Sequence, residues 1–226
     1  MILSILGLLI VPILLSEPLR FQLYPSFSRL LTGSLYASIC FLGIIAIFYP
    51  RSCENTLLLQ NITMKDGANG LGNSEDIEFL GHHPTCKYFE GNRIRISKRW
   101  LCAACSGLLI GALVALIGTI IYFFVDVLFL PVNIGACLIG CITLLLGLVQ
   151  FTLKGFVKLA ANLLFVVGSF TLLVAADALT SNLLINLYVL GLIIFLLFTR
   201  ILISGWNNKR ICGKCQSCLL RSSPRS

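Results

Sequence analysis

A series of long apolar runs constrains the fold of this chain most strongly. Each run has about 20 residues, the length that an α-helix needs to cross the hydrocarbon core of a bilayer. The runs are Leu30–Tyr49, Leu101–Phe124, Val132–Phe151, Val157–Ala176 and Leu183–Ile203. Lipid offers no hydrogen-bond partners to the backbone, so such runs predict helices. The sequence therefore predicts an all-α, polytopic membrane protein.

The opening stretch, Ile2–Leu15, is shorter and contains Pro12. A secretory signal begins with basic residues, and this stretch has none, which favours an uncleaved first helix. The expected number of spans is therefore five or six. Composition agrees, because 58% of the residues are hydrophobic and only 12% are charged, whereas soluble domains carry about 25% charged residues.

Four regions follow from this pattern. Residues 1–50 hold two N-terminal membrane segments, 51–100 form a polar loop, 101–203 form a four-helix membrane region, and 204–226 are a basic, cysteine-rich tail. Within the loop, Asn55–Asp76 is rich in Gly and Asn and reads as a linker. Further on, Tyr88–Glu90 and Ile94–Ile96 flank Gly91-Asn92, a pattern that predicts a β-hairpin.

The basic residues predict the orientation. With six spans, fifteen of the seventeen lysines and arginines fall on one side, and only Arg20 and Arg29 fall on the other. The positive-inside rule then places loop 51–100 and the C-terminus in the cytoplasm of a multi-pass protein of the cell membrane. The chain has a net charge of +8, but its basic residues do not form the aromatic-basic stripe that is typical of a nucleic-acid site. The expected partners are the lipid bilayer and a cytoplasmic protein; the sequence does not predict the oligomeric state.

Two pairs of metal-ligand residues lie on the predicted cytoplasmic side. His83-x2-Cys86 is followed, after fifteen residues, by Cys102-x2-Cys105 at the mouth of the third span. Two such pairs are typical of a structural zinc site, which takes four Cys or His ligands. His82 is an alternative ligand to His83, because it gives x3 spacing to Cys86. The alternative for Cys102 and Cys105 is the packing of two small residues at a helix end.

The tail contains Cys212-x2-Cys215-x2-Cys218. This is the first part of a ferredoxin-type run, but the fourth Cys and the Pro are missing after Cys218. Cys53 or a loop histidine could complete a zinc site or an iron–sulfur cluster. A lipid-anchored basic tail with cysteines available for acylation is the equal alternative. Cys40, Cys137 and Cys141 lie within apolar runs, where packing is expected.

Polar residues inside the runs are few. Asn162 and Asn186 are embedded and are expected to join helices, whereas Arg200 is expected to snorkel from the last turn of its span. Asp126, Asn133 and Asp177 lie near span ends. Gly107 and Gly111, four residues apart, predict a close helix crossing.

The segment from Gly81 to Gly118 resembles an uncharacterised prokaryotic family of small multi-pass membrane proteins. The resemblance rests on Gly81-His82-His83-Pro84-Thr85-Cys86 and on Cys102-Ala103-Ala104-Cys105-Ser106-Gly107-Leu108 with Gly111. It implies that the histidines and cysteines of these motifs are the signature positions of the family. Because the family is uncharacterised, the resemblance does not imply any activity for this chain.

The leading functional hypothesis is an integral membrane protein with a cytoplasmic structural zinc module. A membrane redox protein that uses a Cys102/Cys105 dithiol or an iron–sulfur cluster is the first alternative. A small-solute transporter is the second, and it predicts a cavity between the spans, far from the cysteines. The sequence names no catalytic residue.

Overall fold

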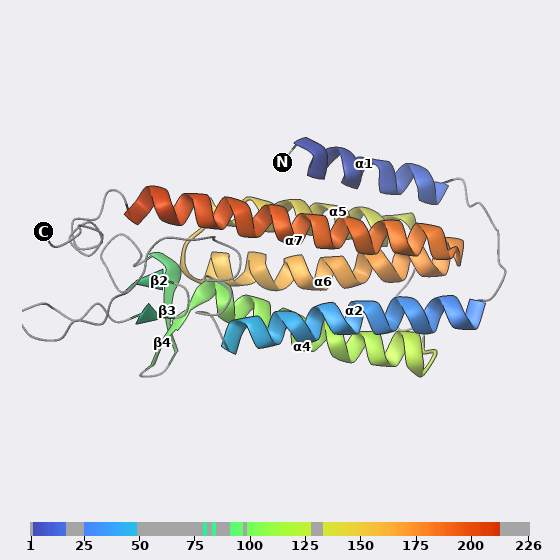
Figure 1. Ribbon diagram of the computed structural model, residues 1–226, viewed down its shortest axis with the longest axis horizontal. Coiled ribbons are helices and arrows are strands. Elements are labelled where there is room, and N and C mark those ends of the chain that lie inside the picture. Colours follow the sequence, from blue (N-terminus) through green and yellow to red (C-terminus); the bar gives the residue numbers. More distant parts are fainter. Residues whose placement is uncertain are drawn as a thin grey trace, which may run out of the picture.

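The computed structural model describes residues 2–16, 25–48, 79–80, 83–84, 91–96, 99–127 and 133–212. Within these residues the fold is all-α, with helices that lie side by side along the long axis and short strands at one end (Figure 1). The helices are α1 (Ile2–Ser16), α2 (Pro25–Phe48), α4 (Ala103–Thr119), α5 (Ile134–Leu148), α6 (Gly155–Thr180) and α7 (Leu183–Cys212). A π-helical turn, Ile120–Phe124, extends α4.

Four of the described helices are long and apolar enough to cross a membrane: Phe27–Phe48, Ala103–Phe124, Gly155–Thr180 and Leu183–Asn207. Helices α1 and α5 have 15 residues each, which is about 22 Å of helix against a hydrocarbon core of about 30 Å. The all-α membrane class is thus supported, but by four long helices rather than by the five or six spans expected from hydropathy.

The length of α5 is set by polar residues at its ends. The Asn133 side chain accepts a hydrogen bond from the backbone N–H of Ala136 at 3.0 Å and caps the helix. At the other end the chain turns into a short 3₁₀ helix, Gln150–Thr152. The hydropathy run continued through both features, because it does not register a cap or a change of helix type.

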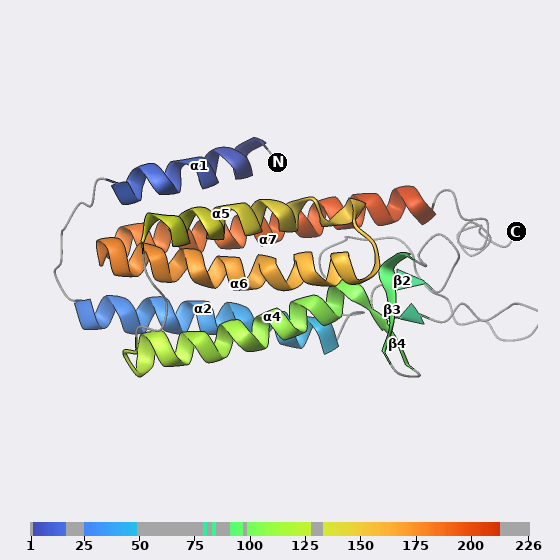
Figure 2. The same cartoon turned by 180° about the vertical axis from the view of Figure 1, so that it is seen from behind.

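Helix α6 lies at the centre of the bundle and packs against α4, α5 and α7. Helix α2 packs on α4, and α1 packs on α5 and α7, so the two N-terminal helices lie on opposite sides of α6 (Figure 2). Cys137 and Cys141 are buried on the α5 face that meets this core, and Cys40 is buried on α2. Their predicted role in packing is confirmed.

The α4–α6 contact is close because α4 presents glycines to α6. A Cβ atom at Gly107 would overlap the backbone oxygen of Leu159 and lie 2.8 Å from the Cβ of Asn162. A Cβ at Gly111 would lie 3.0 Å from the backbone oxygen of Leu163. The close crossing predicted from the glycine spacing is confirmed.

The β-hairpin differs from the predicted one. Strand β3 (Arg93–Ile96) pairs antiparallel with β4 (Arg99–Cys102), with Arg93 opposite Cys102 and Ile96 opposite Arg99. Gly91 and Asn92 form a short 3₁₀ turn before β3 rather than the hairpin turn, and residues 85–90 lie outside the described part of the chain. The third apolar run therefore begins as a strand, and its helix starts only at Ala103.

A second strand pair joins β1 (Phe79–Leu80) and β2 (His83–Pro84), with Leu80 opposite His83. Strand β1 contacts β4. The four strands that the structure describes therefore lie at the end of the bundle where α4 and α6 begin and α7 ends (Figure 1).

The two ends of the bundle differ in charge. Within the described residues, Arg93, Arg95, Lys154, Lys158, Arg200 and Arg210 belong to the end that carries the strands, which we call the basic end. The far end holds Arg29 with Asp126 and Asp177. The basic residues that are described thus gather at one end of the fold, apart from Arg29 at the other.

Helix α2 is anchored to α6 by Tyr36, whose hydroxyl lies 2.7 Å from Ser169 Oγ and donates to the Val166 carbonyl at 3.2 Å. Tyr36→Phe is expected to lower the free energy of unfolding by about 1 kcal/mol, since buried Ser169 loses a partner. Tyr188→Phe is the control, because the exposed Tyr188 hydroxyl bonds only to the Gly7 carbonyl at 3.2 Å, and a loss below about 0.5 kcal/mol is expected. Denaturant titration in detergent measures both, and equal losses would contradict the anchoring role.

Candidate functional site

The Cys-x2-Cys pair lies at a junction between strand and helix. Cys102 is the last residue of β4 and the N-cap of α4, with extended backbone angles (φ −71°, ψ 119°). Cys105 lies in the first turn of α4. Cys102 is buried and Cys105 is half-buried. A helix N-terminus favours negative charge, so both thiols stand where a thiolate is stabilised by the helix.

Two basic side chains interact electrostatically with the thiols. Lys158, near the start of α6, interacts electrostatically with Cys102 and Cys105, and Arg200 of α7 interacts with Cys105. Both cations are almost fully buried, with 7% and 6% of their surfaces exposed. Cations near a cysteine favour its thiolate form, which is the form that binds metals and attacks disulfides.

Lys158 also holds the hairpin to the bundle. Its Nζ donates to the Asn92 side-chain oxygen at 2.7 Å. Asn92 lies in the turn that precedes β3, and β3 contacts α6. The start of α6 therefore positions both the hairpin and the helix end that carries the cysteines.

Arg200 is held inside the bundle by neutral groups. Its Nη2 donates to Gln150 Oε1 at 2.9 Å and to Asn162 Oδ1, and its guanidinium lies 4.7 Å from the ring centroid of Phe165. The prediction that Arg200 snorkels from the last turn is wrong, because α7 continues to Cys212. Asn162 joins α6 to α7 through this bond, as expected of an embedded amide.

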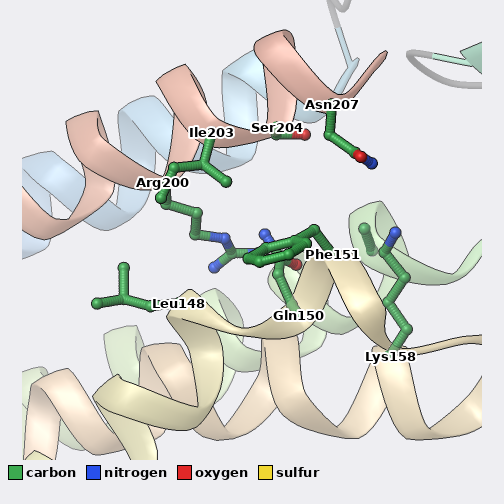
Figure 3. A pocket seen from close by; sticks show the side chains of 9 residues that line it. Leu148, Gln150, Phe151, Lys158, Arg200, Ile203, Ser204 and Asn207 are labelled. Carbon is green, nitrogen blue, oxygen red and sulfur yellow. The ribbon is translucent and has the colours of Figure 1, made fainter. Parts of the chain in front are cut away.

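A small cavity of about 30 Å³ opens beside Arg200. Figure 3 shows the Arg200 side chain reaching from α7 toward Gln150, with Phe151 beside it. We call this cavity the Arg200 pocket. Its lining residues are Ala104, Leu148, Gln150, Phe151, Lys158, Arg200, Ile203, Ser204 and Asn207.

Hydropathy did not reveal this pocket, although a signal was present in α7. Arg200, Ser204 and Asn207 are spaced i, i+4 and i+7, and therefore lie on one face of the helix. A polar stripe of this kind within an apolar helix indicates a shared polar environment. The identity of its partners, Gln150 and Lys158, could not be read from that spacing.

The predicted zinc ligands are described only in part. His83 lies on β2, and its strand partner β1 contacts β4, the strand that ends at Cys102. The side chain of His83 lies outside the described part of the structure, as do His82 and Cys86. Among the residues that are described, no group of three His, Cys, Asp or Glu side chains could hold a metal ion.

The tail cysteines fall almost wholly outside the described residues. Cys212 is the last residue of α7, at the basic end of the bundle (Figure 1). The side chain of Cys212 lies outside the described part of the structure. The same is true of the whole of residues Cys53, Cys215 and Cys218.

A different polar cluster occupies the far end of the bundle. Asp177, which is 3% exposed, accepts hydrogen bonds from Tyr122 Oη at 3.0 Å and Asn186 Nδ2 at 2.7 Å, and pairs with Arg29 Nε at 3.3 Å. Arg29 also pairs with the exposed Asp126. The Asn186 side chain of α7 thus donates a hydrogen bond to Asp177 of α6, so this embedded amide joins two helices as predicted.

Comparisons of the chain with protein-family models, with curated proteins and with solved structures return no match. The resemblance of the Gly81–Gly118 segment to a prokaryotic membrane family therefore stays a prediction.

Proposed function

We propose that this chain is an integral membrane protein whose basic end carries a structural zinc module. One zinc ion would be held by His83, Cys86, Cys102 and Cys105, with His82 as the alternative to His83. The observation that carries this proposal is the position of Cys102 and Cys105 at a strand–helix junction, within electrostatic reach of the cations Lys158 and Arg200.

The charge of such a site suits its surroundings. One Zn²⁺ with three thiolates and one neutral imidazole has a formal charge of −1. Lys158 and Arg200 are cationic neighbours that would stabilise this charge, and the N-terminus of α4 adds to the effect. A site with net positive charge would be repelled by the same groups.

The strand pairing supports the assignment of His83. Strand β2 is joined to β4 through β1, so the backbone of His83 belongs to the same group of strands as Cys102. Four protein ligands would close the metal site and leave no position for water, which is the arrangement of a structural rather than a catalytic zinc. Its role would be to fold the loop and to present the basic hairpin, through Arg93 and Arg95, to a cytoplasmic protein. The cytoplasmic location rests on the positive-inside rule.

A dithiol redox protein is the second candidate. The observation in its favour is that Cys105 is partly accessible and lies next to two cations at a helix N-terminus, the environment of a reactive thiolate. An iron–sulfur cluster at the tail cysteines and a small-solute transporter remain predictions. The transporter hypothesis placed its cavity far from the cysteines, whereas the Arg200 pocket is lined by Ala104, the neighbour of Cys105.

The test is elemental analysis with a visible spectrum on detergent-purified protein. We expect about one zinc ion per chain, as for a single closed site, and no visible absorbance. The double variant Cys102→Ala/Cys105→Ala is expected to lose the zinc. The matched control, Cys137→Ala/Cys141→Ala, removes two thiols from the core of α5 and should retain it.

The remaining outcomes separate the candidates. Protein without metal, with two fast-reacting thiols that are lost in Cys102→Ala/Cys105→Ala, would replace the zinc module by the dithiol. Iron with visible absorbance would move the assignment to electron transfer. Zinc that persists in Cys102→Ala/Cys105→Ala would show that these cysteines are not its ligands.

A further inference from the structure

The Arg200 pocket contains a buried cation with an unused donor. Arg200 is 6% exposed, and its Nη1 has no hydrogen-bond partner among the residues that the structure describes. Its Nη2 bonds go to two amide oxygens, those of Gln150 and Asn162. Amides satisfy donors but carry no charge, and an arginine stays protonated in proteins. A full positive charge therefore lies inside the bundle with one donor free beside a cavity.

A second cation lines the same pocket. Lys158 is 7% exposed, and its hydrogen bond goes to another neutral group, the amide of Asn92. The two cations repel one another. Among the described residues no Asp or Glu lines the pocket, and the two described carboxylates, Asp126 and Asp177, are engaged with Arg29 at the far end of the bundle. Two buried like charges are costly unless an anion joins them, and the described residues supply no carboxylate at the pocket.

We propose that the Arg200 pocket binds a single phosphate group. The planar guanidinium of arginine matches the oxygens of phosphate, and lysine adds a point charge. Ser204 and Asn207 bring a hydroxyl and an amide to the same pocket from successive turns of α7. The geometry of this inference needs only described side chains, although Lys158 and Arg200 are shared with the proposed zinc module. A zinc site with a charge of −1 would offset one of the two positive charges, so an anion is still needed for the other.

The size of the pocket limits the ligand. The cavity measures about 30 Å³, whereas sites for organic ligands usually measure about 300–1,000 Å³. By the measure in which one water needs about 10–15 Å³, the pocket has room for one small oxyanion group. The rest of a larger molecule would remain outside.

The phosphate group has two possible sources: free inorganic phosphate and the headgroup of an anionic phospholipid. Lys158 lies close to the start of a long apolar helix. Trp206, which is exposed, belongs to the same end of α7 as the pocket residues Ser204 and Asn207. Exposed tryptophans are typical of the membrane–water interface, which is where phospholipid phosphates are found. The experiment therefore has one arm for each source.

In the first arm, delipidated full-length protein in neutral detergent is dialysed against radiolabelled inorganic phosphate at constant ionic strength. In the second arm, the protein is equilibrated with phosphatidylglycerol or phosphatidylcholine, and retained lipid is counted by native mass spectrometry. We expect one phosphate or one phosphatidylglycerol per chain, with phosphatidylcholine retained less.

The variants test whether the bound group is in the Arg200 pocket. Arg200→Gln should weaken binding by about 10- to 100-fold, the effect of losing a hydrogen bond to a charged group. Lys158→Gln should weaken it as well, and it serves as the second test if Arg200→Gln does not fold. The control is Arg210→Gln, since Arg210 is an exposed base on α7 that stacks over Trp206 at 5.8 Å. It should leave the affinity unchanged.

Binding in the first arm alone would assign the pocket to free phosphate, and binding in the second alone would assign it to a lipid headgroup. Either result supports the phosphate site. Absence of binding in both arms overturns it, as does binding that Arg200→Gln and Lys158→Gln leave at the wild-type affinity. Zinc content is measured on the same samples, so loss of the metal module and loss of the phosphate site are recorded separately.

Discussion

Replacement of Gly107 by alanine is expected to lower the free energy of unfolding by about 3 kcal/mol, near the upper end of typical overpacking costs. The new methyl group would overlap the backbone oxygen of Leu159 and press on Asn162. A backbone carbonyl inside α6 cannot rotate away as a side chain can, so α4 and α6 must separate. Cys105 lies two residues before Gly107, and the displacement should therefore also reduce retention of the zinc ion that we propose at Cys102 and Cys105.

The measurement is denaturant titration in detergent, with zinc content determined on the same sample. Gly43→Ala is the matched control, because it is also a glycine of a long apolar helix but has no atom within 4 Å of its added Cβ. Alanine has a higher helix propensity than glycine by about 1 kcal/mol, so Gly43→Ala should be neutral or stabilising. Equal stability of the two variants would contradict the close α4–α6 crossing.

Asp177→Ala is expected to have a similarly large effect, about 3 kcal/mol, the lower end of the range for breaking a buried ion pair. The substitution removes the acceptor of Tyr122 and Asn186 and one of the two carboxylates paired with Arg29. We expect a loss at the lower end of this range because the Arg29 side chain is 28% exposed and still pairs with Asp126 in the variant.

Asp126→Ala provides the control for this prediction. Asp126 contacts the same Arg29, but its side chain is 75% exposed, and an exposed ion pair contributes up to about 1 kcal/mol. The double variant Arg29→Met/Asp177→Ala should be more stable than the sum of its two single variants predicts, since it also removes the buried Asp177 carboxylate that Arg29→Met alone would leave without its cation. Comparable losses for Asp126→Ala and Asp177→Ala would show that burial does not determine the strength of these pairs.

The sequence predicted the approximate positions of the helices better than the residues at which they begin and end. The runs that begin at Val157 and Leu183 correspond to α6 and α7, and the spacing of Gly107 and Gly111 correctly predicted a close crossing. The run from Leu101 was read as helix throughout, yet its first residues pair with Arg93–Ile96 as a strand. Short strands next to a membrane helix are apolar as well, so hydropathy alone does not separate the two.

The candidate site was predictable only in part. Cys102 and Cys105 were identified from their spacing, and the structure adds Lys158 and Arg200 as their neighbours. Arg200 was assigned to the aqueous end of its span because the apolar run stopped at Ile203. The helix runs on to Cys212, which leaves Arg200 within the bundle, where Gln150 and Asn162 bind it.

The sequence by itself determined the class of this protein. Long apolar runs must form helices wherever lipid replaces water, because the backbone can satisfy its hydrogen bonds only within the segment. The tertiary structure decided which polar side chains meet: Arg200 with Asn162 across 38 residues of sequence, and Arg29 with Asp126 across 97. These contacts depend on how closely two helices cross and on where each helix ends. The closeness of a crossing depends in turn on single residues such as Gly107, which brings α4 close to α6 only because α6 packs against it.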